Sequence, residues 1–101
     1  TELTIVEICA VVSMIDAFIC TIGSGLVIPT WIYNKPGIAH GDKGHLAQKT
    51  MWQHVTPSMF DSKLVTFLDE NEIEPLDNNS YGNYRLHIDL ISNSIRDILK
   101  L

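Results

Sequence analysis

The chain has 101 residues, a formal charge of −5 and 46% hydrophobic residues. This length suits one domain, and the composition is that of a globular protein rather than a disordered chain. Twelve acidic against seven basic residues leave no basic stripe to displace counterions from phosphates, which argues against a nucleic-acid partner.

Residues 3–22 carry the strongest helix signal. Their apolar residues recur at spacings of three and four, as on one face of a helix: Ile5, Ile8, Val12, Ile15, Ile19 and Ile22. The other side of this helix carries small residues, among them Cys9, Ser13, Ala17 and Cys20. Because small side chains let a second helix approach closely, we expect this side to be the interface of a homo-oligomer or of a complex with a protein partner.

The two cysteines lie too far apart to pair along one helix. Cys9 and Cys20 would be separated by about 16 Å, whereas a disulfide requires Cα atoms closer than about 7 Å. They are therefore either free buried thiols or linked to another chain. Free thiols suit a reducing compartment, so we expect a cytoplasmic protein.

A membrane span over residues 8–28 is an alternative interpretation of the same apolar stretch. Asp16 is its one charge, and near the middle of a span it would cost about 2.5–3.5 kcal/mol on insertion scales. Glycines at positions 23 and 25 also interrupt the run. A buried helix is therefore favoured over a membrane subunit.

Residues 23–44 predict a loop that includes one short edge strand or an extended linker. Residues 26–33 have the β-branched and aromatic content of a strand, but Pro29 would confine it to a sheet edge. Residues 34–44 hold one proline and three glycines, which is typical of a loop.

Three further helices are predicted, over residues 45–55, 57–71 and 85–100. Thr56-Pro57 resembles an N-cap followed by proline at the first helical position. The last helix is marked by a periodic apolar stripe, Ile88, Ile91, Ile95 and Ile98. The sequence thus predicts one mostly α domain over residues 1–101, a small bundle of about four helices with at most one edge strand near residues 26–33.

The stretch IAHGDKGH gathers metal-ligating residue types. His40, Asp42 and His45 lie within six residues, and His54 follows nearby; all four are plausible zinc ligands. Their spacing fits no strong zinc motif, and no cysteine accompanies them. A polar hinge between the apolar first third and the rest is the alternative, and we favour it.

A second candidate metal site lies in DNNSYGN. Asp77, Asn79 and Gly82 stand at positions one, three and six of a calcium-binding EF-hand loop, whereas Tyr81 and Ile88 stand at positions five and twelve. The segments TEL, SMIDAF and GDKGHL resemble those of the small dimeric EF-hand proteins, which implies calcium binding. The other interpretation is a turn rich in Asn and Gly.

Residues 60–95 are similar to the second half of acyl or peptidyl carrier proteins. FDSKLVTFLDENEIEP has an Asp-Ser pair followed by an acidic segment, and GNYRLHIDLISNSI leads into the last helix. The resemblance implies that Ser62, at the start of a helix, carries phosphopantetheine. It also implies that partner enzymes dock on Asp69, Glu70 and Glu72.

No catalytic constellation, glycine-rich phosphate loop or nucleophile elbow is recognisable in the sequence. We therefore predict a non-enzymatic, small helical binding or interaction domain that is oligomeric through its first helix. A carrier-like protein, a metal-binding protein and a small membrane subunit are the alternatives. The sequence names no cofactor.

Overall fold

A three-stranded parallel sheet forms the centre of the molecule. The computed structural model describes residues 3–54, 61–79 and 81–100. The strand order in this sheet is β1 (Phe18–Thr21), β2 (Gly37–His40), β3 (Val65–Phe67). A two-stranded antiparallel sheet, β4 (Ile73–Pro75) and β5 (Tyr84–Leu86), follows it in the chain.

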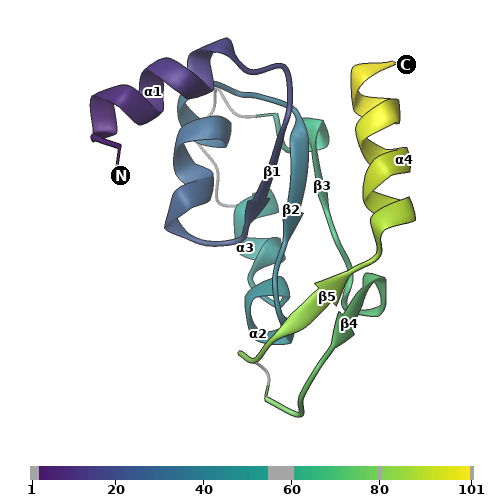
Figure 1. The fold of residues 1–101 in the computed structure, drawn as a ribbon. Helices are drawn as coiled ribbons and strands as arrows, with labels where there is room; N and C mark the ends of the chain where they lie inside the picture. Colours follow the sequence, from purple (N-terminus) through teal and green to yellow (C-terminus); the bar gives the residue numbers. More distant parts are fainter. Residues whose placement is uncertain (1–2, 55–60, 80, 101) are drawn as a thin grey trace.

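Helical segments lie on both sides of the parallel sheet (Figure 1). The crossover from β1 to β2 contains η1 (Ser24–Leu26) and the π-helix η2 (Ile28–Ile32). The crossover from β2 to β3 contains α2 (Lys43–Leu46), α3 (Lys49–His54) and η3 (Ser62–Leu64). Both crossovers advance in the same direction across the sheet, so right-handed connections place them on one face. On the other face, α4 (Ile88–Leu99) packs against β2.

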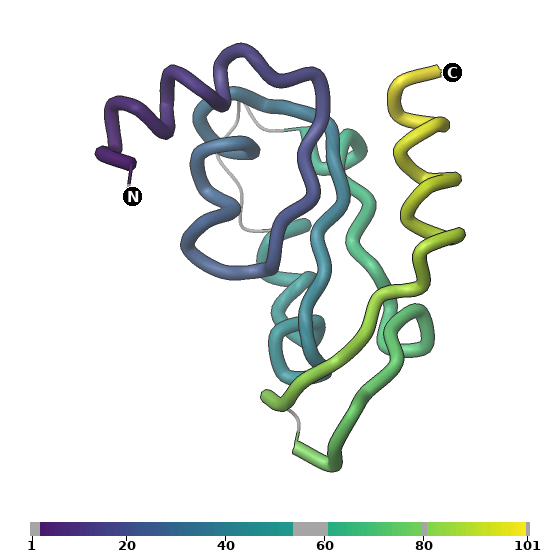
Figure 2. Tube along the Cα trace, viewed as in Figure 1, coloured from purple at the N-terminus to yellow at the C-terminus, as the bar shows by residue number. Residues whose placement is uncertain are grey.

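The remaining two helical elements lie at the periphery. The N-terminal helix α1 (Ile5–Met14) lies against η2, away from the sheet, as the tube view also shows (Figure 2). The short η4 (Glu70–Glu72) lies between β3 and β4.

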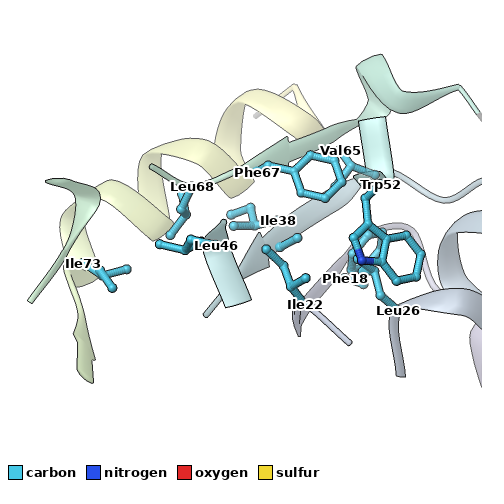
Figure 3. Close-up of a cluster of buried hydrophobic side chains, with 11 residues drawn as sticks. Phe18, Ile22, Leu26, Ile38, Leu46, Trp52, Val65, Phe67, Leu68 and Ile73 are labelled. Atoms are coloured by element: carbon cyan, nitrogen blue, oxygen red, sulfur yellow. The ribbon is translucent and has the colours of Figure 1, made fainter. Parts of the chain in front are cut away.

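The core is built around the central strand. Gly37, Ile38 and Ala39 of β2 are all buried, as expected for a parallel strand covered on both faces. Side chains from both crossovers and from the neighbouring strands complete the core (Figure 3): Phe18, Ile22, Leu26, Leu46, Trp52, Val65, Phe67, Leu68 and Ile73. Helix α4 packs its half-buried Leu90, Ile91, Ile95 and Ile98 against this cluster.

Close packing between β1 and β2 requires a glycine at position 37. Gly37 is the register partner of Phe18. A Cβ atom at position 37 would lie 2.5 Å from both the ring and the carbonyl oxygen of Phe18. The role of Gly37 is therefore to let the two strands approach closely, not to make a loop flexible.

The predicted mostly α bundle is wrong, because the fold is a mixed α/β structure with a parallel sheet. Strands buried on both faces give short continuous apolar runs, which periodicity alone does not distinguish from buried helix. GIAH is such a strand, but the proline and glycines around it predicted a loop. FICT and VTF are the edge strands, bury alternate residues, and fall within the predicted helices 3–22 and 57–71.

The predicted helix over residues 3–22 stops after ten residues. A capping box fixes its start: Thr4 Oγ1 accepts the Glu7 N–H, and the Thr4 N–H donates to Glu7 Oε1. The backbone becomes extended at Ile15, with ψ of 154°, and β1 follows. Within the described residues, no helix is long and apolar enough to cross a membrane.

Residues 23–44 contain more structure than the predicted loop. Residues 26–33 form no strand but a 3-10 turn and a π-helix, where the Thr30 hydroxyl donates to the Leu26 carbonyl over 2.6 Å. Here the aromatic content serves packing, because Trp31 lies against Trp52 with ring centroids 4.9 Å apart. The expected loop over residues 34–44 contains β2, the central strand.

The later helices are confirmed only in part. The helix predicted over residues 45–55 is divided between α2 and α3, and residue 55 lies outside the described residues. Of the helix predicted over residues 57–71, residues 57–60 lie outside the described residues, and the rest forms η3, β3 and part of η4. The final helix is confirmed as α4, except that residues 84–86 form β5.

Candidate functional site

Strands β1 and β2 end at the end of the sheet where α2 and β5 lie (Figure 1). Polar residues from these elements line a common cavity there. Thr21 is the last residue of β1 and His40 the last of β2, and Asp42 follows before α2 begins. In open α/β sheets, ligands bind outside the carboxyl ends of the strands. This end of the sheet is therefore the first place to look for a site.

Asp42 and His45 form one hydrogen-bonded pair. Asp42 is the N-cap of α2: its Oδ1 accepts the His45 N–H over 2.9 Å and lies 2.8 Å from His45 Nδ1. Because a carboxylate only accepts, Nδ1 carries the proton in this contact, and Nε2 is the other ring nitrogen available to a partner. The Asp42 side chain is only 12% exposed, so the pair is held in a defined geometry.

His40 and Tyr84 form a second pair. His40 Nδ1 lies 2.7 Å from Tyr84 Oη, across 44 residues of sequence. Burial lowers the pKa of His40, so the imidazole is neutral near pH 7. Burial, and then the negative charge of Asp42, raise the pKa of Tyr84, so its hydroxyl stays protonated. We assign Tyr84 O–H as the donor and His40 Nδ1 as the acceptor.

A small cavity of about 220 Å³ lies beside these pairs. Its walls come from the two strand ends, from the start of α2 and from β5: Thr21, Ile22, Gly41, Asp42, His45 and Tyr84. Tyr81, in the turn between β4 and β5, packs edge-on against the His45 ring with centroids 5.4 Å apart. Gly44 permits this contact, because a Cβ there would overlap the Tyr81 ring.

Neither Tyr84 nor Tyr81 was predicted from the sequence to belong to this cluster. Their partners, His40 and His45, lie far from them in the chain, and no short-range spacing indicates the contacts. The packing of the β4–β5 hairpin against the end of the parallel sheet brings them together.

The structure gives no support to the predicted zinc site. His40 and His45 lie at the same end of the sheet as Asp42, but His40 pairs with Tyr84 and His45 with Asp42. Among the described residues, no three His, Cys, Asp or Glu side chains are placed so that they would hold a metal ion. His54 ends α3, and its side chain lies outside what the structure describes.

In the EF-hand-like loop, the side-chain oxygens of Asp77 and Asn79 accept hydrogen bonds from backbone N–H groups of the same loop. Asp77 Oδ1 accepts the Asn79 N–H and Oδ2 accepts the Asn83 N–H, while Asn79 Oδ1 accepts the Tyr81 N–H. These bonds are the side-chain-to-backbone turns typical of Asp and Asn. The segment joins β4 to β5 as a turn, which is the alternative that the sequence left open.

The local structure around Ser62 is not the one that the resemblance to carrier proteins implies. Ser62 is half-buried in the three-residue η3, which leads into β3 rather than into a helix. Two of the three acidic residues in the implied docking face pair within the chain: Glu70 lies 3.1 Å from Lys43, and Asp69 pairs with Lys49.

The four residues of the predicted interface do not share one helical face. Cys9 and Ser13 lie on α1, whereas Ala17 follows the helix and Cys20 belongs to β1. The half-buried residues of α1, among them Cys9, mark the side of the helix nearer the body of the molecule. Cys9, Ser13, Ala17 and Cys20 therefore do not form the single helical interface that the sequence predicted.

The outward side of α1 carries a different apolar row. Val6, Ala10 and Met14 are spaced as one helical face and are all exposed; together with exposed Leu3, which precedes the N-cap Thr4, we call them the α1 stripe. Val6 is 74% and Met14 82% exposed, and α1 buries none of its residues. Beyond Met14, a mostly apolar groove of about 590 Å³, with Asp16 in its lining, continues along Phe18 and Ile19 to Ile95 and Leu99 of α4.

Comparisons with protein-family models, with curated proteins and with solved structures found no match for this chain.

Proposed function

We propose that the protein is a non-enzymatic interaction domain that self-associates through the α1 stripe. The observation that carries this proposal is that α1 is strongly apolar yet buries none of its residues. Contiguous exposed apolar side chains of this kind mark interaction sites on folded proteins. The groove beyond Met14 extends the same apolar surface toward α4.

The length of α1 also supports association. It has ten residues, and isolated helices shorter than about 12–15 residues are marginal in water. Its capping box and the bond from Lys35 Nζ to the Ser13 carbonyl hold its two ends. A second apolar surface against the α1 stripe would add the burial that the helix lacks within one chain.

A two-fold arrangement suits the charge pattern of α1. In a symmetric dimer the same stripe faces itself, so like charges within it would repel. Glu7 is the one charged residue of α1 and lies beside the stripe rather than in it. The stripe itself contains no charge.

The test is a native mass measurement of the wild type and of two Arg variants. Ala10→Arg places a charge in the centre of the α1 stripe at an exposed position, so we expect monomers where the wild type forms dimers. Ala47→Arg is the matched control, because Ala47 is also exposed but lies beyond α2, away from α1. A wild type that is monomeric, or an Ala10→Arg variant that keeps the dimer mass, contradicts the proposal.

The two thiols fit a reducing compartment such as the cytoplasm, which we include in the proposal. Cys9 and Cys20 are both free and half-buried. Burial raises the pKa of Cys20, which keeps that thiol protonated and unreactive. Thiol labelling of the protein in cell extracts, with and without prior reduction, tests this: a large increase on reduction would contradict it.

A further inference from the structure

The cavity at the carboxyl ends of β1 and β2 has the chemistry of a ligand site that is separate from the α1 stripe. It contains a buried carboxylate, an imidazole, a phenol and a threonine hydroxyl within about 220 Å³. Pockets for drug-sized ligands occupy about 300–1,000 Å³, so this cavity suits a smaller molecule.

The hydrogen-bonding groups in the cavity are mainly acceptors. Asp42 Oδ1 is engaged by His45, while no described residue donates to Oδ2. His45 Nδ1–H donates to Asp42, so Nε2 is the ring nitrogen left for another partner. Tyr84 gives its proton to His40, so its oxygen offers lone pairs. A ligand for this set must bring donors.

The charge in the cavity is negative. Among the described residues that line the cavity, Asp42 is the one acidic residue and none is Lys or Arg. The ammonium of the adjacent Lys43 is turned to Glu70, at 3.1 Å, and Arg85, next to Tyr84, faces Glu74 at 3.8 Å. A nearly buried carboxylate that no Lys or Arg of the described residues contacts favours a positive ligand.

The aromatic wall also favours a cation. The Tyr84 ring lines the cavity, and the negative face of such a ring attracts an ammonium group. Because no metal-holding group of three ligands exists among the described residues, an organic cation fits the site better than a bare metal ion. Its N–H groups match the oxygen acceptors of Asp42 and Tyr84.

We propose that this cavity binds a small primary ammonium compound, with the ammonium group on Asp42 and against the Tyr84 ring. Asp42 supplies the charge complement and the strongest hydrogen bond. Tyr84 and His45 supply orientation, and the Ile22 side of the cavity accommodates the first carbons of the ligand.

The test uses three probes of equal length: butylammonium, 1-butanol and butyrate. They are titrated into the full chain at constant ionic strength while amide NMR signals are followed. We expect saturable shifts with butylammonium at Thr21, Gly41, Asp42 and His45, and none of comparable affinity with butanol or butyrate. Equal binding of butanol, or tighter binding of butyrate, overturns the proposal, as does the absence of saturable shifts with butylammonium.

Asp42→Asn separates the ligand role of Asp42 from its structural one. Asn is as good an N-cap as Asp, so α2 should be retained while the charge is lost. The affinity for butylammonium should fall roughly tenfold to a hundredfold, as for a lost hydrogen bond to a charged group. Asp97→Asn, on the exposed surface of α4, removes the same charge elsewhere and should leave the affinity unchanged.

Tyr84→Phe provides a second variant in case Asp42→Asn disturbs the fold. It keeps the aromatic ring of this lining residue and removes the hydroxyl that bonds to His40. We expect a smaller loss of affinity, roughly threefold to tenfold, with the same ammonium preference. An unchanged affinity in both variants places the ammonium elsewhere and overturns the proposal. Because neither variant touches α1, a failure here leaves the dimer test independent.

Discussion

His40 lies where β2 ends, and burial there lowers its pKa below the ordinary value of 6.5. Its ring is neutral in the folded protein, and Nδ1 accepts the Tyr84 hydroxyl. In the unfolded chain the same ring takes up a proton at higher pH than in the folded one. The folded state therefore binds fewer protons, and stability depends on pH through this residue.

The direction of the pH dependence follows from the lowered pKa of His40 in the folded state. Above the unfolded pKa of 6.5 the ring is neutral in both states and its contribution is fully present. As the pH falls below this value, the unfolded state gains the proton first and stability is lost. Urea midpoints measured at about pH 7 and about pH 5 should fall more for the wild type than for His40→Gln, which has no such proton to bind. An identical fall in both proteins would show that His40 is not the cause.

At the scale of elements, the contact between β1 and β2 depends on position 37 being a glycine, which has no side chain. Gly37 lies against Phe18 so closely that a Cβ would overlap both the ring and the backbone of that residue. Backbone is not free to move away as the end of a flexible side chain is. The parallel pairing of β1 with β2 therefore tolerates no larger residue at this register position.

Two glycine-to-alanine variants test this. Gly37→Ala should destabilise the protein by about 1–3 kcal/mol or more through overpacking. Gly25→Ala is the control, because its added Cβ would meet only Cys20 Sγ, at an ordinary 3.9 Å. We expect it to be within about 0.5 kcal/mol of the wild type. Urea denaturation gives both values, and equal effects of the two substitutions would argue against the close approach of the strands.

At the scale of the whole molecule, some helical segments pack their apolar side chains against the core, whereas others leave them exposed. Both crossovers bury side chains against the sheet, and α4 packs half-buried side chains against the core. By contrast, α1 adds no side chain to this cluster, and β1 leaves Ile19 46% exposed. Helix α4 packs against β2, and its Ile95 and Leu99 line the same groove as Ile19 without burying it. The exposed apolar side chains of α1 and β1 thus lie near one another, linked by the groove beyond Met14.

If copies of the chain associate through this surface, stability should depend on protein concentration. Dimer formation stabilises the folded state by mass action, so the thermal midpoint should rise over a roughly hundredfold increase in concentration. The Ala10→Arg variant should show a midpoint that is independent of concentration. Calorimetry at several concentrations measures both, and a flat profile for the wild type would be at odds with self-association.

The sequence by itself determined the features that depend on neighbours along the chain. The 77–83 turn follows from Asp and Asn side chains that bond to the backbone within six residues. The apolar stripe of α4 follows from its helical spacing, and its Ile91, Ile95 and Ile98 do pack against the core. The Asp42–His45 pair is likewise local, because an N-cap reaches the residue three positions on.

Only the tertiary structure decided the parallel sheet and the composition of the cavity. FICT and GIAH become strands because each finds its hydrogen-bonding partner in the other, across a crossover of fifteen residues that hides the pairing from any local pattern. Tyr84 reaches His40 only after the β4–β5 hairpin has packed against the sheet. A parallel strand gains its backbone hydrogen bonds from distant segments, and for this reason the local pattern predicts helix for FICT and VTF and a loop for GIAH.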